Sequence, residues 1–356
     1  MKTIPVIQLG IGNVGLQLVR KVMNFNQTNS DYFIRYIGIA DSRYLTFRPE
    51  GMNRELPGIL RHKGIRSVES SIVHASSGGL YHILELLKGE KTDCLCIVDA
   101  TASEDISGFL RRCVIRGFNL VLANKKPLTG KMADFHMLNR ARLGCRATVG
   151  AGLPVIPEIR KILSDSESIC KLEGCFSGTM GILCSALEKG EPFSAIVEEV
   201  KRKGYTEPDP RDDLSGMDIA RKILILARFC GYNIELIDVT VDSLYPGTME
   251  ALPLEEFMAN LKNLDAGYKI MFDQARKKNA TLRFAASLEK GKCRAGMKEV
   301  MVKSVIGRLK GPEKAVIITT GKRKKESLVI HGSGAGAESA AKDMLEDILE
   351  VSDCNW

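Results

Sequence analysis

Short apolar runs alternate with helical stretches over the first 150 residues of the chain. Strands are predicted at five of these runs: residues 4–9, 36–40, 94–100, 120–123 and 146–149. A helical period follows the first run at residues 14–23. Such alternation is typical of βαβ units, so the pattern predicts an α/β domain at residues 1–150 with a doubly wound parallel sheet of the Rossmann type.

The pattern changes after residue 150. Helical periods occur at 153–163, 193–203 and 217–230, and strand-like runs occur at 172–176, 239–244, 281–286 and 316–320. Strands and helices without strict alternation indicate an α+β domain, which we expect at residues 151–335. A last helix is predicted at 338–351, after the glycine-spaced stretch that ends at Gly336.

Composition and charge limit the kinds of partner. The chain has 356 residues, 44% hydrophobic and 26% charged, which is typical of an ordered protein of two domains. The net charge is +8, but the basic residues are scattered among acids, and the one basic run, at 322–325, lies between strand-like stretches. We interpret it as a solvated hairpin turn and expect neither nucleic acid nor a membrane as a partner. No apolar run is long enough to span a bilayer.

The ten cysteines form no CxxC pair. Cys94 and Cys96 are expected on one side of a single strand. We interpret the cysteines as reduced, mostly buried thiols and expect a cytoplasmic protein. The chain enters its first predicted strand within a few residues, so no signal or transit peptide is expected.

A glycine motif follows the first predicted strand and opens the first helix: Gly10, Ile11, Gly12, Asn13, Val14 and Gly15. Gly10 permits a tight turn, Gly12 lets the backbone approach a pyrophosphate, and Gly15 lets the helix pack on the strand. In this context the motif predicts a dinucleotide site. A glycine turn of purely structural use is the alternative.

Two charged residues after the second predicted strand bear on the choice of cofactor. Asp41 favours the ribose of NAD, whereas Arg43 could pair with the 2′-phosphate of NADP. Asp41 lies 31 residues after Gly10, which we attribute to an inserted polar turn at 24–30. Their coexistence predicts use of NADP(H) or NAD(H), with NADPH slightly preferred. An exposed turn without a ligand is the alternative.

Further polar residues lie where the fold would place a ligand. Thr101 and Lys125 follow the third and fourth predicted strands, and ligands bind beyond the carboxyl ends of parallel strands. Residues 204–213 form an acidic, proline-rich loop that leads into a helix with Asp218 and Lys222 on one face. A solvated Lys125 and an ordinary surface ion pair are the alternatives.

The loop and helix at 204–222, Asn124-Lys125, residues 147–154 and Ser177-Gly178-Thr179 together resemble homoserine dehydrogenases of the single-function form. The resemblance covers nearly the whole chain. It implies NAD(P)-dependent hydride transfer between L-aspartate 4-semialdehyde and L-homoserine, a step in the synthesis of threonine, methionine and isoleucine. It also implies a homodimer paired through strands around 281–330 and a last helix, within 336–356, that returns to the first domain. We expect neither a kinase domain before the chain nor a sensing domain after it.

The resemblance also assigns roles to residues. Lys222 matches the proton donor to the substrate's carbonyl oxygen, and Lys125 matches a lysine at the junction of cofactor and substrate. The matches to substrate-binding residues are Glu207, Asp218, Asp213, Thr179 and Tyr205. Thr101 matches a residue by the nicotinamide, and Gly204 and Gly336 match cofactor contacts.

The chain departs from the family in two places. Arg146 stands where relatives usually carry a glutamate that helps bind a monovalent metal, and Ala102 replaces a frequent serine. The backbone carbonyls that match sodium ligands are those of Val149, Ala151 and Leu153. Because a positive charge repels a cation, we expect little dependence on sodium.

Two other functions compete with this interpretation. A dehydrogenase that forms a cysteine thioester would need an activated thiol beside a base, and no such pair is evident. A nucleotide sensor without turnover would not need Lys125, Glu207, Asp218 and Lys222, all of which are present.

Overall fold

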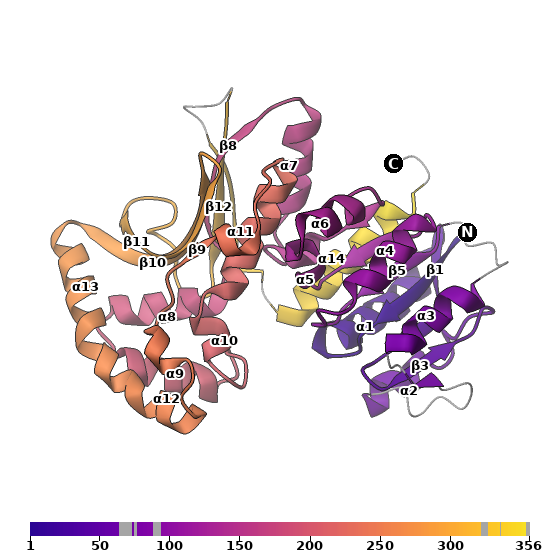
Figure 1. The fold of residues 1–356 in the computed structure, drawn as a ribbon, viewed down its shortest axis with the longest axis horizontal. Coiled ribbons are helices and arrows are strands. Elements are labelled where there is room, and N and C mark those ends of the chain that lie inside the picture. The colour runs from indigo at the N-terminus through magenta and orange to yellow at the C-terminus, as the bar shows by residue number, and fades with distance from the viewer. Residues whose placement is uncertain (64–72, 75–76, 88–93, 322–326, 335, 354–356) are drawn as a thin grey trace. The chain divides into compact units, whose positions relative to one another are not determined.

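The computed structural model describes residues 1–63, 73–74, 77–87, 94–321, 327–334 and 336–353. The chain divides into two compact units, one of residues 1–152 with 335–356 and the other of residues 153–334. The first unit has a largely parallel sheet with helices, and the second has a mixed sheet with helices (Figure 1). The α/β class predicted from the sequence is therefore confirmed.

The first unit contains a seven-stranded sheet in the order β4-β3-β2-β1-β5-β6-β7. Its strands are β1 (Lys2–Leu9), β2 (Tyr32–Ala40), β3 (Tyr44–Phe47), β4 (Val73–His74), β5 (Cys96–Asp99), β6 (Asn119–Leu122) and β7 (Leu143–Gly144). Five adjacent strands pair in parallel, in the order β2-β1-β5-β6-β7. At the edge next to β2, the strands β3 and β4 pair antiparallel. β5 and β6 are buried along their whole length, as expected for parallel strands covered on both faces.

Helices accompany this sheet. They are α1 (Asn13–Thr28), α2 (Leu56–His62), α3 (Ser77–Leu86), α4 (Ser107–Ile115), α5 (Lys126–Thr129), α6 (Met132–Leu138), the 3₁₀ helix η2 (Arg146–Thr148) and α14 (Gly336–Val351). The last helix, α14, packs beside α1, because its apolar face (Ala341, Met344, Ile348) shares a core with Leu18 and Val22.

The second unit contains a six-stranded sheet in the order β13-β12-β8-β10-β11-β9. Its strands are β8 (Ile169–Cys175), β9 (Thr240–Val241), β10 (Ala280–Glu289), β11 (Lys292–Met301), β12 (Lys314–Thr320) and β13 (Leu328–Gly332). Its helices are α7 (Val155–Ser164), α8 (Gly178–Glu188), α9 (Phe193–Arg202), α10 (Arg211–Leu214), α11 (Met217–Phe229), η3 (Leu236–Asp238), η4 (Gly247–Met249), α12 (Leu254–Asn260), η5 (Leu261–Leu264) and α13 (Asp265–Lys277). Three of them, α8, α11 and α13, pack on β10.

Three expectations for the first unit are wrong. Residues 146–149 were expected to form the fifth strand, but Arg146–Thr148 is a 3₁₀ helix, and the two-residue β7, too short to show a period, pairs with β6 instead. The polar stretch at 24–30 is not an inserted turn, because α1 continues to Thr28 and the Asn26 side chain bonds to the backbone of Ile34 at 2.8 and 2.9 Å. Cys94 lies before β5 in a left-handed conformation (φ 64°), so it does not share a strand face with the buried Cys96.

In the second unit the strand expected at 239–244 shrinks to Thr240–Val241. The strand β11 was not predicted, although its ten residues pair along their whole length with β10; four of the ten are charged. Only its Cys293, Ala295 and Gly296 are buried, so its sequence carries a weak apolar signal. The basic run at 322–325 lies outside the described residues, although the flanking β12 and β13 pair antiparallel.

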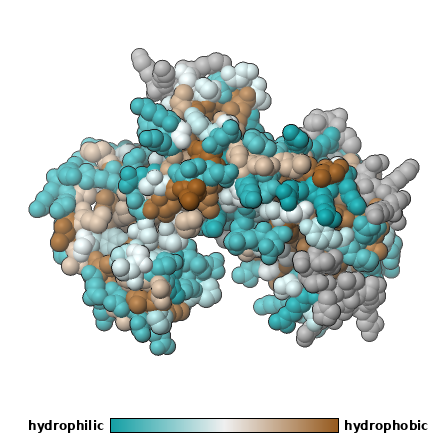
Figure 2. Space-filling model, viewed as in Figure 1, coloured by the Kyte–Doolittle hydropathy of each residue, from teal (hydrophilic) through white to brown (hydrophobic). Residues whose placement is uncertain are grey.

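The surface of the described chain is mixed. Polar residues cover most of the face drawn in Figure 2, and apolar residues form separate patches among them. In the parts of the chain that the structure describes, no helix is both long and apolar enough to cross a membrane.

Candidate functional site

The glycine turn between β1 and α1 has the geometry that the motif predicts. Gly10 adopts a φ of 90°, and a Cβ there would lie 2.8 Å from the backbone of Ala100. A Cβ on Gly15 would lie 2.2 Å from the carbonyl oxygen of Gly10, so the helix can start this close to the turn only with glycine. Around Gly12, by contrast, nothing lies within 4 Å of the Cβ position. Two glycines therefore shape the turn, and the third leaves open space at the start of α1.

The other residues of the motif differ in exposure. Asn13 is exposed beside the open Gly12, whereas Ile11 is buried in the core of the unit and Val14 packs against that core. Ile11 and Val14 thus anchor the turn, and Gly12 and Asn13 present it to solvent.

A buried glutamine that was not predicted from the sequence supports this turn by hydrogen bonds. Gln8 is fully buried in β1, and its Nε2 donates to the carbonyl oxygens of Gly10 (2.9 Å) and Gly15 (3.1 Å). Its Oε1 accepts from the hydroxyl of Tyr36 at 2.7 Å. A glutamine in an otherwise apolar strand, two residues before a glycine turn, was the available signal, because a buried amide needs partners.

The turn after β2 uses Asp41 structurally. One carboxylate oxygen of Asp41 accepts from the backbone N–H groups of Arg43 and Tyr44, each at 2.7 Å. This is an Asx turn, in which the side chain replaces a backbone partner. Arg43 is exposed at the tip of the turn.

A hydrogen-bonded network joins the ends of β5 and β6. Asp99 is fully buried and accepts from the backbone and hydroxyl of Thr101 (2.9 and 2.7 Å) and from the amide of Asn124 (3.1 Å). Burial raises the pKa of Asp99, although these hydrogen bonds oppose the rise. Asn124 also donates to the carbonyl oxygen of Ser103 at 2.8 Å. The network fixes the loop of Thr101 against the segment that carries Lys125, which is the N-cap residue of α5.

In the second unit, a lysine and an aspartate form a close pair at the start of α11. Lys222 Nζ lies 2.5 Å from an Asp218 carboxylate oxygen and donates to the carbonyl oxygen of Phe176, just after β8, at 3.1 Å. The side chain of Lys222 is 14% exposed and that of Asp218 is 44% exposed. The ammonium is therefore held by two acceptors from different elements, whereas an ordinary surface pair would leave both groups in water.

The loop between α9 and α10 lies beside this pair. The hydroxyl of Thr179, at the start of α8, donates to the carbonyl oxygen of Tyr205 at 2.8 Å. Asp213 accepts from the backbone N–H of Glu207 at 2.9 Å. Burial, reinforced by Glu207 and Asp218, raises the pKa of Asp213 to about 6. The second unit thus pairs Lys222 with Asp218, whose charge acts on Asp213, and Asp213 in turn binds the backbone of Glu207.

The remaining predicted contacts are backbone features. Gly204 ends α9 in a left-handed conformation (φ 70°), with the N–H of Tyr205 bonded to the carbonyl oxygen of Val200. This is a Schellman-type ending, which favours glycine on structural grounds alone. Gly336 opens α14 with a φ of 84°.

Arg146 is directed toward α14. It pairs with Asp347 at 2.5 Å and with Glu350, while Asp343 of the same helix accepts from the N–H of Gly152 at 2.7 Å. Val149 and Leu153 are buried and Ala151 is half-buried. Within the described ranges, no three His, Cys, Asp or Glu residues are grouped so that they could hold a metal ion.

Burial makes several thiols unsuitable as nucleophiles. It raises the pKa of Cys184 to about 11 and the pKa values of Cys230 and Cys293 to about 12. A thiol that attacks a carbonyl needs the opposite change. These three cysteines therefore do not support thioester chemistry.

An open glycine turn on a parallel sheet places the first unit in the class of Rossmann-type dinucleotide-binding proteins. Residues 154–349 match the model of the homoserine dehydrogenase family. The chain belongs to this family.

Curated relatives agree with this assignment. The chain is 30% identical over 370 residues to the homoserine dehydrogenase of Schizosaccharomyces pombe, covering 96% of this chain and 94% of that protein. It is also 30% identical over 360 residues to the bifunctional aspartokinase/homoserine dehydrogenase of Haemophilus influenzae, covering 98% of this chain but only 43% of that protein. The chain thus spans about two fifths of the length of the bifunctional relatives that it matches.

A Candida auris protein of unknown function has a similar structure, with a TM-score of 0.86, 27% identity and coverage of 99% and 98%. A hyperthermophilic archaeal homoserine dehydrogenase in complex with NADPH has a TM-score of 0.75, with 98% of this chain and 97% of that chain covered. Its identity of 18% is evidence for the fold alone.

Proposed function

We propose that the protein is an NAD(P)-dependent homoserine dehydrogenase that interconverts L-aspartate 4-semialdehyde and L-homoserine. The observation that carries the proposal is the Lys222 ammonium, which is held by Asp218 and by the Phe176 carbonyl, while Asp218 in turn lies near Asp213. Membership of the family and the open turn at Gly12 support it.

The cofactor site consists of Gly10 to Gly15 and the loops that carry Thr101 and Lys125. The open space at Gly12 and the N-terminus of α1 fit a pyrophosphate. When bound, the nicotinamide donates hydride to an aldehyde or accepts it from an alcohol. Arg43 is exposed at the end of β2 and suits a 2′-phosphate, so we propose use of either cofactor with NADPH slightly preferred.

The substrate site combines two opposite charges. The substrate's ammonium binds to Glu207 and Asp213, and its positive charge favours the ionised form of Asp213. Two of the three N–H donors of Lys222 are directed at Asp218 and Phe176, so the third serves the substrate oxygen. In reduction, Lys222 donates its proton to the nascent alkoxide; in oxidation, it accepts the hydroxyl proton. Thr179 donates to the carbonyl oxygen of Tyr205 and thereby positions the start of the loop that carries Glu207.

Assembly and location stay proposals. Met301, Val302 and Val305 are exposed apolar residues at the end of β11 and just after it, which supports a homodimer paired through this part of the second unit. Sedimentation at assay concentration tests the dimer. The cytoplasmic location stays a prediction from the sequence. The same is true of the expectation that Arg146 makes a sodium ion at the carbonyls of Val149, Ala151 and Leu153 unimportant for activity.

The activity is tested by steady-state oxidation of L-homoserine with NADP and with NAD. Lys222→Ala should lower turnover by roughly 10²–10⁴-fold, because it removes the proton donor, and should leave NADPH affinity close to wild type. Lys269→Ala is the matched control, because Lys269 forms an i,i+4 pair with Asp273 on an exposed face. Turnover of Lys222→Ala within a factor of about three of wild type would refute this role. A wild-type protein that binds NADPH but does not oxidise homoserine would instead be a nucleotide sensor.

A further inference from the structure

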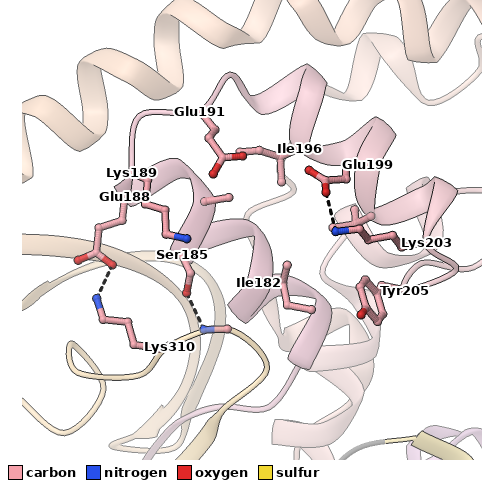
Figure 3. A pocket seen from close by; sticks show the side chains of 13 residues that line it. Ile182, Ser185, Glu188, Lys189, Glu191, Ile196, Glu199, Lys203, Tyr205 and Lys310 are labelled. Carbon is pink, nitrogen blue, oxygen red and sulfur yellow. Dashed lines mark hydrogen bonds and ion pairs between the residues drawn. The ribbon is translucent and has the colours of Figure 1, made fainter.

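A cavity of about 680 Å³ lies between α8, α9 and the chain at Lys310 and Gly311 (Figure 3). Its volume is within the range of roughly 300–1,000 Å³ that is usual for sites of small molecules. Lys222, Asp218, Asp213 and Glu207 do not line it, and Tyr205 alone belongs to both places. The cavity is therefore distinct from the proposed substrate site, although it adjoins the same loop.

One wall of the cavity is apolar. Ile182 and Ala186 lie one turn apart on α8, and Ile196 and Val200 lie one turn apart on α9. Residues at this spacing share a helix face, so the two helices turn these faces toward the same space. An apolar wall in an open cavity favours a ligand with an aliphatic portion.

The charged residues of the cavity separate into paired and unpaired groups. Lys203 pairs with Glu199 at 2.6 Å, and Lys310 pairs with Glu188 at 3.0 Å. Lys189 and Glu191 also line the cavity, but their side chains have no hydrogen bond or ion pair with the described part of the chain. Among the residues that the structure describes, one ammonium and one carboxylate at the cavity thus have no side-chain partner.

These two residues lie on either side of Gly190, in the turn that joins α8 to α9. Figure 3 shows both side chains leaving this turn at one end of the cavity, with Ile182 and Tyr205 toward the other end. A ligand that satisfies the whole arrangement carries a carboxylate and an ammonium at one end and an aliphatic chain at the other. Because both groups are exposed, a ligand with a single charge would replace water at one of them and leave the other hydrated.

We propose that this cavity is a second binding site for a free α-amino acid with an aliphatic side chain. Lys189 binds its carboxylate, Glu191 binds its ammonium, and the side chain lies against Ile182, Ala186, Ile196 and Val200. Both charged residues are exposed, so each contributes modestly to the affinity.

The site is coupled to the loop of Glu207 through α9. Tyr205 lines the cavity, its N–H bonds to Val200 in the last turn of α9, and its carbonyl accepts from Thr179. A ligand seated against Ile196 and Val200 contacts the turn that positions Tyr205. Occupancy should therefore change the KM for homoserine, and this consequence, unlike the binding itself, rests on the proposed dehydrogenase activity.

The binding test uses L-norleucine as the probe and calorimetric titration of the full chain. Hexanoate and pentylamine are the matched analogues that lack the ammonium and the carboxylate, respectively. We expect norleucine to bind roughly tenfold more tightly than either analogue, because each loses one charge-assisted contact. The titration is done in the Glu207→Gln variant, which weakens binding of the probe in the substrate site.

Variants assign the site. Lys189→Met and Glu191→Gln should each weaken norleucine roughly threefold to tenfold, whereas Lys262→Met and Glu198→Gln, exposed residues outside the cavity, should not. Ala186→Trp, which fills the cavity, should abolish binding, and the two charge variants keep the test decisive if this variant does not fold. The proposal is overturned if norleucine does not bind, if hexanoate binds as well as norleucine, or if binding is unchanged in both charge variants; loss of binding in Asp218→Asn would then place the probe in the substrate site. Binding requires no turnover, so an inactive protein would leave this result interpretable, and an unchanged KM at saturating norleucine would overturn only the coupling.

Discussion

Asp213 should make the protein less stable at neutral pH while improving its affinity for substrate. Its carboxyl lies on the short helix α10 near Glu207 and Asp218, and burial raises its pKa from 3.8 to about 6. A group whose pKa is higher in the folded than in the unfolded state opposes folding when it ionises. The penalty is absent below pH 3.8, grows as the pH rises toward about 6, and is complete above that value.

The magnitude follows from the pKa difference. A rise from 3.8 to about 6 corresponds to about 3 kcal/mol, as an upper bound. Asp213 is only half-buried, so solvent screening reduces the expected penalty to about 1–2 kcal/mol. Asp213→Asn removes the charge but keeps an oxygen that can accept from the N–H of Glu207. The variant should therefore be more stable than wild type near pH 8, and the difference should be smaller near pH 5.

Urea unfolding of both proteins at the two pH values measures this difference. Asp212→Asn is the control, because Asp212 is the exposed neighbour. In the same variant, the KM for homoserine should rise roughly tenfold or more, since a charge-assisted contact to the substrate's ammonium is lost. A stability difference that is equal at both pH values would refute the electrostatic reasoning, and an unchanged KM would remove Asp213 from the substrate site.

Three further predictions concern the first unit. Arg43→Ala should weaken NADPH by about 1.5–3 kcal/mol and NADH much less, because only NADPH has a phosphate to lose; equal weakening in fluorescence titrations would assign Arg43 a structural role. Gly15→Ala should weaken both cofactors and lower the melting temperature, because its Cβ would lie 2.2 Å from the Gly10 carbonyl oxygen. Gly117→Ala, which strains a left-handed residue (φ 76°) in the turn after α4, should leave cofactor affinity unchanged. Turnover should change little between sodium, potassium and a large organic cation at constant ionic strength, because Arg146 replaces the family's carboxylate; saturable activation by one alkali ion would show that backbone carbonyls suffice.

The sequence alone determined the strongly patterned parts of the fold. β1 and the start of α1 were predictable because a continuous apolar strand, a glycine turn and a helical period occur together. Asp218 and Lys222 could be placed on one helix face because that relation depends only on the helical repeat. The family could be identified from several motifs in order. The strand β7 could not be predicted because its two residues show no period, and β11 could not because charged residues interrupt its few apolar positions.

Only the tertiary structure decided what the polar residues contact. Gln8 of β1 accepts from the Tyr36 hydroxyl of β2, 28 residues away, and Asp99 of β5 accepts from Asn124 after β6, 25 residues away, so these partners meet only when the strands pair. Arg146 contacts carboxylates some 200 residues away on α14, so its direction could not follow from its neighbours in the chain. The same holds for Lys222, whose second acceptor comes from the end of β8. Local pattern fixes which residues share a face, whereas long-range packing fixes which of those faces meet and therefore which charges remain for a ligand.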